Sequence, residues 1–238
     1  MTRPLLILNQ VFFLFVLTIS VASCATGTSG RQYHAPIGAE LVANEAVVRL
    51  PFSDTWDLLI GQLAKSFFVI NNVDKASRII NVSFSTDKPG QYIDCGITER
   101  SFQYANESQT SSNPVAESNS FKVVRKWGPY ELPVIAYLDR KTSLEGRINV
   151  YVAPKDNDTV VTVNARYIFT SAVSGRAEII SAFGTVSRID AVPETKSTLS
   201  FNTGQLGSAD WGTPQEPAIV KCRSTGRLES EILAMAKR

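Results

Sequence analysis

The side chains that could carry out chemistry are few in this chain of 238 residues. Three cysteines, Cys24, Cys95 and Cys222, accompany a single histidine, His34. A nucleophilic hydroxyl or thiol needs a nearby base, most often histidine, and His34 lies in a segment that we expect to be a tether. A zinc site would need more histidine or a Cys-x-x-Cys pair, which the sequence lacks. The cysteines are therefore expected to be modified or paired.

Carboxylates offer the remaining route to catalysis. Single acidic residues stand near the ends of predicted strands, at Asp94, Glu99, Glu145 and Glu178. Acid–base catalysis needs two such groups to converge in a cleft, whereas scattered acids are usually solvated charges. The sequence has no GxGxxG, phosphate-binding loop or GxSxG motif. We therefore predict that the protein is not an enzyme and uses no cofactor.

The first 23 residues have the three parts of an export signal. Arg3 supplies the charge, residues 11–21 are apolar, and Ala22 and Ser23 form a small-residue exit. The apolar stretch is shorter than the roughly 20 residues that cross a bilayer, so we expect the segment to be removed. An ordinary secretory signal with a chance cysteine and a buried apolar helix are the alternatives.

The residues at the exit, Val21, Ala22, Ser23 and Cys24, resemble the lipobox of bacterial lipoproteins. The resemblance implies that the Cys24 thiol receives a diacylglycerol, that cleavage precedes it, and that the lipid anchors the chain to a membrane. Ala25, rather than aspartate, favours the outer membrane, with the domain in the periplasm. Residues 24–44 are predicted to be a flexible tether.

Charge gives no case for a nucleic-acid partner. Arg3 is the one charged residue in the signal segment, which leaves 23 of the 24 Lys and Arg residues against 22 Asp and Glu. Phosphate recognition depends on clustered cations, and none stands out. The remaining chain of about 215 residues can bury a sizeable core, and we predict a single domain over residues 45–238.

Cys95 and Cys222 are left in the folded part after acylation of Cys24. Two thiols in an oxidising compartment commonly pair, so we predict a disulfide between them. Two buried free thiols or a metal site are the alternatives.

The strongest local pattern predicts a helix that starts at Ser53 as N-cap and places apolar residues on one face. Those residues are Trp56, Leu59, Ile60, Leu63, Ala64 and Phe67. Alternating residues predict antiparallel hairpins over 68–85 and 144–170, and a β-prone segment over 96–107. Residues 108–120, rich in Ser, Asn and Thr, are predicted to be a long exposed loop, and a last helix follows Ser224. The predicted fold class is α+β, with one antiparallel sheet packed by an N-terminal-side and a C-terminal helix.

This order of elements over residues 46–85, with the helix start Phe52 to Trp56 and the turn residues Asn72 to Lys75, resembles the helix-grip modules of BamC-like bacterial lipoproteins. The resemblance implies a helix packed across a curved sheet and a binding or scaffolding role in an envelope complex. It supplies no catalytic residue.

Two binding functions remain. A helix over a curved sheet can enclose a small hydrophobic ligand, and the expected wall is Trp56, Phe67, Phe84, Tyr151, Tyr167 and Phe169. The alternative, which we favour, is that these aromatics fill the core. An interaction module would instead use a sheet edge or the 108–120 loop, with Trp127, Tyr130 and Trp211 as contact residues for unidentified envelope proteins. We favour the interaction module by elimination.

Overall fold

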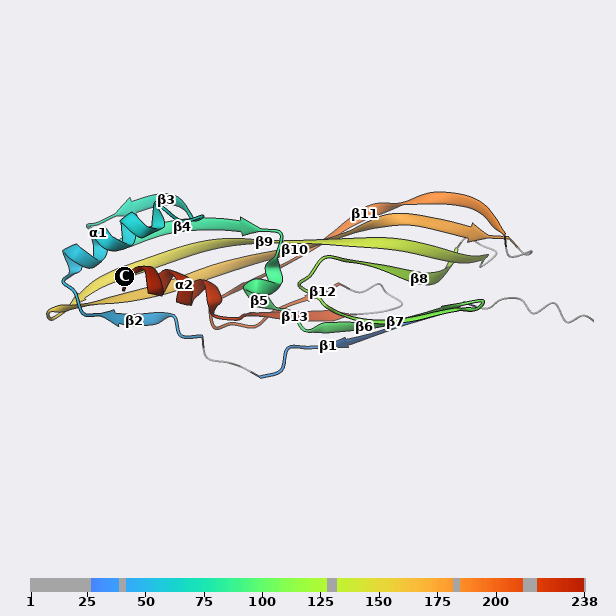
Figure 1. The fold of residues 1–238 in the computed structure, drawn as a ribbon, viewed down its shortest axis with the longest axis horizontal. Coiled ribbons are helices and arrows are strands. Elements are labelled where there is room, and N and C mark those ends of the chain that lie inside the picture. Colours follow the sequence, from blue (N-terminus) through green and yellow to red (C-terminus); the bar gives the residue numbers. More distant parts are fainter. Residues whose placement is uncertain (1–26, 39–41, 128–131, 182–184, 212–217, 238) are drawn as a thin grey trace, which may run out of the picture.

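The computed structural model describes residues 27–38, 42–127, 132–181, 185–211 and 218–237. Of these residues, 64% lie in strands and 12% in helices. Figure 1 shows an elongated molecule with both α-helices at one end and only strands at the other. The predicted two-layer α+β plan is therefore wrong. Antiparallel strands build several sheets, and the helices cover only one end of the largest.

Two long strands connect the ends of the molecule. β9 (Leu132–Lys155) and β10 (Asp158–Ile180) contain 24 and 23 residues and pair antiparallel along almost their whole length. At 3.2–3.4 Å per residue, each is roughly 75–80 Å long. Asp156 makes the connecting turn with a φ of 54°, in the left-handed region that aspartate tolerates better than most residues. The hairpin predicted over 144–170 is thus present but extends much further.

The end that carries the turn of this hairpin is called the helical end. Here the strand order is β2-β10-β9-β4-β3, all antiparallel, with β2 (Glu45–Val48), β3 (Val69–Asp74) and β4 (Ile79–Thr86). Gly146 of β9 lies opposite Phe84 of β4, and a Cβ on this glycine would stand 2.1 Å from the Phe84 ring. The absence of a side chain there lets the ring lie across β9 in the core.

Both helices pack on one face of the sheet at the helical end. α1 (Phe52–Leu63) buries Trp56, Leu59 and Leu63, as its spacing predicts. It begins at Phe52, because the Pro51 carbonyl accepts a hydrogen bond from the Thr55 amide, so Ser53 lies inside the first turn. α2 (Arg227–Met235) follows Gly226 and places Leu228, Ile232 and Leu233 in the same core.

One acidic side chain is fully buried in this core. Glu229 of α2 accepts hydrogen bonds from Tyr167 at 2.8 Å, Thr203 at 2.7 Å and Ser224 at 3.1 Å. Three hydroxyl donors compensate the carboxyl group for lost water. Burial, followed by the nearby Glu229, raises the pKa of the Tyr167 hydroxyl well above its usual range.

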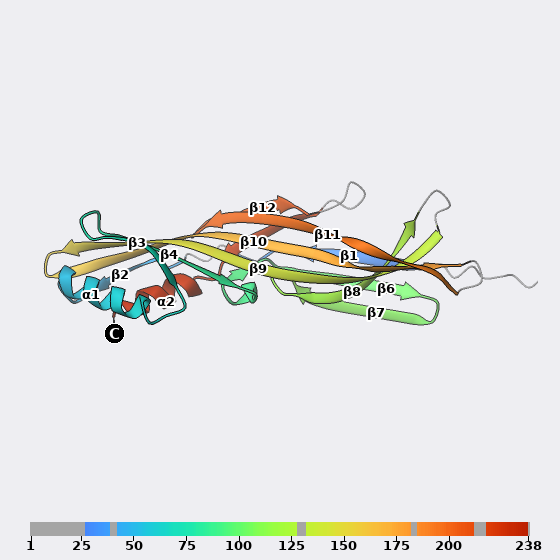
Figure 2. The same cartoon turned by 90° about the horizontal axis from the view of Figure 1, so that it is seen from above.

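The described residues of the opposite end, called the strand end, form no helix. β8 (Asn119–Trp127) and β11 (Val186–Asn202) flank β9 and β10, and a separate sheet of order β1-β6-β7 lies against them. Figures 1 and 2 show this second sheet at the end away from α1 and α2. Its strands are β1 (Thr28–His34), β6 (Ile97–Tyr104) and β7 (Glu107–Pro114).

Two further predictions are corrected at the strand end. Residues 28–34 were expected in the tether but form β1, which pairs with β6 from Thr28–Gln103 to His34–Ile97. Residues 108–120 were expected to be a loop but belong largely to β7 and the start of β8. Both segments are polar strands whose backbone groups are paired with neighbours.

A short sheet occupies the middle of the molecule. It has the order β12-β13-β5, with β12 (Gly207–Asp210), β13 (Ile219–Ser224) and β5 (Ile93–Asp94), and a single 3₁₀ turn (Pro89–Gln91) precedes β5. This sheet lies between the helical end and the β1-β6-β7 sheet in Figure 1.

Candidate functional site

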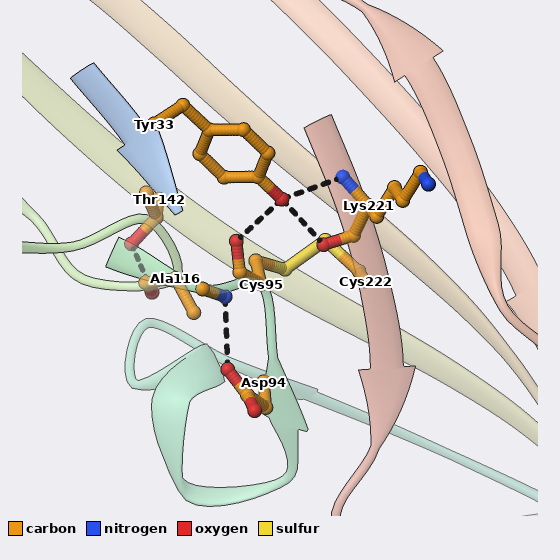
Figure 3. Close-up of a disulfide and its surroundings, with 8 residues drawn as sticks. Tyr33, Asp94, Cys95, Ala116, Thr142, Lys221 and Cys222 are labelled. Carbon is orange, nitrogen blue, oxygen red and sulfur yellow. Dashed lines mark hydrogen bonds between the residues drawn. A yellow bond between two sulfur atoms is a disulfide. The ribbon is translucent and has the colours of Figure 1, made fainter. Parts of the chain in front are cut away.

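The predicted disulfide is present and joins the middle sheet to the start of β6. Cys95 and Cys222 are bonded, both buried, and 127 residues apart in sequence (Figure 3). The Tyr33 hydroxyl of β1 accepts a hydrogen bond from the Lys221 amide at 2.9 Å and lies 3.2 Å from the Cys95 carbonyl oxygen. Burial raises the pKa of Tyr33. The disulfide and the hydrogen bonds of Tyr33 therefore hold three segments together at one point: β1, the middle of the chain and its C-terminal part.

The six aromatics predicted to line a ligand cavity are divided between the core and the surface. Four of them, Trp56, Phe84, Tyr167 and Phe169, are at most 5% exposed and belong to the main core. The other two, Phe67 and Tyr151, are 56% and 42% exposed. Of the set, Phe67 and Phe84 line one groove of about 470 Å³.

The three predicted contact residues have different outcomes. Tyr130 and the side chain of Trp127 lie outside the described residues, as does Cys24. Trp211, which follows β12, is half-buried rather than exposed, and its ring centroid lies 5.4 Å from that of Phe169. Its indole Nε1 is buried without a hydrogen-bond partner among the described residues.

The four acidic residues considered for catalysis do not converge. Asp94 accepts a hydrogen bond from the Gly96 amide at 2.8 Å, Glu99 lies 3.6 Å from His34, and Glu178 lies 3.5 Å from Arg176. Glu145 is exposed on β9 at the helical end. Within the described ranges, no three His, Cys, Asp or Glu side chains are grouped to hold a metal ion.

A cleft at the strand end combines apolar and basic side chains. It encloses about 340 Å³ between β1 and β6 on one side and β11 and Trp211 on the other, and we call it the interlayer cleft. Its apolar lining comes from Phe121, Val123, Leu138, Val173 and Val192. The Val124 amide donates a hydrogen bond to the Ser29 hydroxyl at 2.7 Å, which fixes β1 against β8 at the edge of the cleft.

Among the described residues, the interlayer cleft is lined by three arginines, Arg31, Arg100 and Arg125, and by one acidic residue, Asp210. Arg31 and Arg100 are register partners in β1 and β6, so their side chains leave the β1-β6-β7 sheet on the same face. The Arg100 guanidinium stacks on the Phe121 ring, with 3.8 Å from Cζ to the ring centroid. The lining therefore carries an excess of positive charge over an apolar floor.

A fourth arginine lies beside this floor. Arg140 follows Leu138 on the same face of β9 and is the register partner of Val173, so two of its neighbours line the cleft. It is 7% exposed, donates to the Pro114 carbonyl at 3.0 Å, and has no carboxylate partner and no partner for Nε in the described part of the chain. Burial, followed by the charge of Arg31, lowers the pKa of Arg140 to about 10.

Arg140 was not among the predicted site residues, although the sequence pattern around it indicates a buried charge. The other residues on its face of β9 are apolar or small, namely Val134, Ala136, Leu138, Thr142 and Leu144. A charged residue within such an alternating series is the informative exception, because buried cations are normally paired. Asn119, the register partner of Arg140 in β8, also has both amide atoms buried without a partner in the described ranges.

The chain matches no family model, and comparison with curated proteins and with solved structures gave no match either. The BamC-like resemblance therefore stays a prediction. No described helix has the length and apolar character needed to span a bilayer.

Proposed function

We propose that this chain is a lipid-anchored, non-catalytic binding or scaffolding module of the bacterial cell envelope. The export signal and the lipobox-like residues before Cys24 support the anchor, and Ala25 favours the outer membrane with the domain in the periplasm. The observation that carries the proposal is the position of β1. It begins at Thr28, four residues after Cys24, where a chain spans at most about 14 Å.

A tether this short determines which end of the molecule would face the membrane. Thr28 pairs with Gln103, next to the β6–β7 turn at the strand end and far from the turn of the β9–β10 hairpin (Figure 1). A lipid on Cys24 would hold the strand end at the membrane surface. The helical end would then project away from the membrane by a distance approaching the length of β9, roughly 75–80 Å.

The helical end offers a surface for a protein partner. Phe67 and Val69, which are 56% and 60% exposed, line a groove of about 470 Å³ together with Glu145 and Arg147. β3, which contains Val69, is the last strand on its side of the sheet. An envelope protein that presents an extended segment could add a strand to this edge and place an apolar side chain in the groove.

The anchor is tested by the mass of the N-terminal peptide of the membrane-extracted protein. We expect this peptide to begin at Cys24 and to carry a diacylglycerol, and Cys24→Ala to remove the lipid and membrane fractionation. Thr26→Ala is the matched control and should change neither. An unmodified Cys24 thiol in the mature protein, or tight membrane association of a processed Cys24→Ala chain, contradicts the anchor.

The orientation is tested by photo-cross-linking in intact cells. A photoreactive amino acid at Val69 should form adducts with envelope proteins, because the helical end projects from the membrane. The same amino acid at Thr110, exposed on β7 at the strand end, is the control and should give few protein adducts. Protein adducts from Thr110 alone would oppose the proposed orientation.

A further inference from the structure

We propose that the interlayer cleft binds a small amphiphile with one oxyanion headgroup, a carboxylate or a phosphate, held by Arg31, with its apolar part on Phe121, Leu138 and Val192. This inference goes beyond the envelope role and does not depend on the anchor. It rests on the composition of the cleft, on the buried polar groups beside it and on its size.

The charge of the cleft favours an anion. The side chain of Arg31 makes no hydrogen bond or ion pair within the described ranges, although its charge lowers the pKa of Arg140. Arg31 lines the cleft with a planar guanidinium group, which suits bidentate contact with a carboxylate or phosphate. An oxyanion there would relieve the repulsion between Arg31 and Arg140.

The buried polar groups beside the cleft form the second, independent observation. Arg140 is more than nine-tenths buried and has no carboxylate partner among the described residues, while its Nε is unpartnered. The indole Nε1 of Trp211, which lines the cleft, is buried and unpartnered too. Buried donors are nearly always satisfied in folded proteins, so an unsatisfied donor on the lining and another beside it favour a polar group bound in the cleft.

The size and apolar lining limit the ligand. A volume of about 340 Å³ is near the lower end of ligand pockets, which excludes a two-chain phospholipid but admits a short single chain. The floor between Phe121 and Val192 is apolar, so an inorganic anion would leave it uncovered. Headgroup and chain must therefore both contribute to binding.

Native mass spectrometry of the full-length lipidated protein tests the inference with dodecyl phosphate as the probe. We expect one molecule to bind per chain, and dodecanol and inorganic phosphate each to bind at least tenfold more weakly, because each keeps only half of the contacts. Arg31→Gln should weaken the binding of dodecyl phosphate at least about tenfold, because the charged hydrogen bonds are lost. Arg166→Gln, an exposed arginine on β10 outside the cleft, is the matched control and should bind as the parent does.

Val192→Phe provides a second variant that keeps every charge and fills part of the cleft. This variant should also weaken the binding of dodecyl phosphate, while its circular dichroism spectrum stays unchanged. Three results would overturn the proposal: no binding of dodecyl phosphate, equal binding by the parent and both cleft variants, or equal affinity for inorganic phosphate, which would indicate an adventitious ion only. Cys24→Ala should bind the probe unchanged, so failure of the anchor and failure of the cleft can be told apart.

Discussion

The two ends of the molecule share the β9–β10 hairpin, but different elements cover it at each end. At the helical end, β9 and β10 are covered by α1 and α2, and the buried acid Glu229 has three hydroxyl donors. At the strand end, the same two strands are covered by a polar sheet, and Arg140 and Trp211 beside the cleft have donors without a partner in the described part of the chain. The comparison indicates that the helical end supplies stability, whereas the strand end carries groups that a ligand would satisfy.

The largest effect on stability is expected from the disulfide that joins the middle sheet to the start of β6. Cys222→Ser opens a crosslink across 127 residues, and in the chain-entropy model this removes roughly 4–5 kcal/mol from the free energy of unfolding. Thermal unfolding under oxidising conditions should show a lower melting temperature and a strand end that melts first. An unchanged melting curve would show that the disulfide does not contribute to the stability of the fold.

Leucine-to-alanine substitutions at the two ends measure how much each end contributes to the free energy of unfolding. Leu59→Ala in α1 leaves a void in a filled core and should cost about 2–5 kcal/mol. Leu138→Ala on the cleft floor should cost clearly less, about 1–2 kcal/mol, because the removed atoms already border an open space. Both side chains are at most 3% exposed, so burial alone predicts equal losses. Equal losses in denaturant unfolding would therefore contradict the proposed division of roles.

The sequence predicted the features that depend on apolar spacing or on cysteine count. The face of α1, formed by Trp56, Leu59 and Leu63, follows from helical periodicity, and the disulfide follows from two remaining thiols in an oxidising compartment. The positions of the hairpins over 68–85 and 144–170 follow from alternation. These patterns arise because one side of each element is buried.

The strand end could not be predicted in the same way. No side chain of β1 or β7 is fully buried, and both sequences are mostly polar, so neither shows the apolar–polar alternation that identifies a half-buried strand. Their stability comes from backbone hydrogen bonds to β6, which depend on partners far away in sequence. The interlayer cleft shares this origin, since only the register of β1 with β6 brings Arg31 beside Arg100. A polar stretch such as Ser108–Ser120 therefore looks like a loop until its partner strand is known.

The Tyr167–Glu229 contact tests whether the buried polar groups of the helical end are stabilised by their hydrogen bonds. Tyr167→Phe removes one of three donors to Glu229 and should cost about 1–2 kcal/mol at neutral pH. Because the folded pKa of Tyr167 lies above its unfolded value near 10, the hydroxyl stabilises the fold below pH 10, and this contribution is lost as pH rises further. The difference between parent and variant should therefore shrink above pH 10 in urea unfolding. A difference that grows with alkaline pH would contradict the assignment.

The smallest effect on the free energy of unfolding is expected at Arg140, where a substitution should stabilise the protein rather than destabilise it. A buried cation without a carboxylate carries an uncompensated desolvation penalty, so Arg140→Met, of similar length, should stabilise the ligand-free protein by about 1 kcal/mol despite losing the bond to the Pro114 carbonyl. Denaturant unfolding measures the gain, and Arg166→Gln on the exposed face serves as the control. If dodecyl phosphate binds as proposed, it should stabilise the parent more than Arg140→Met. Destabilisation of the variant in the absence of ligand would show that Arg140 already contributes to the fold, and that the strand end is as well satisfied as the helical end.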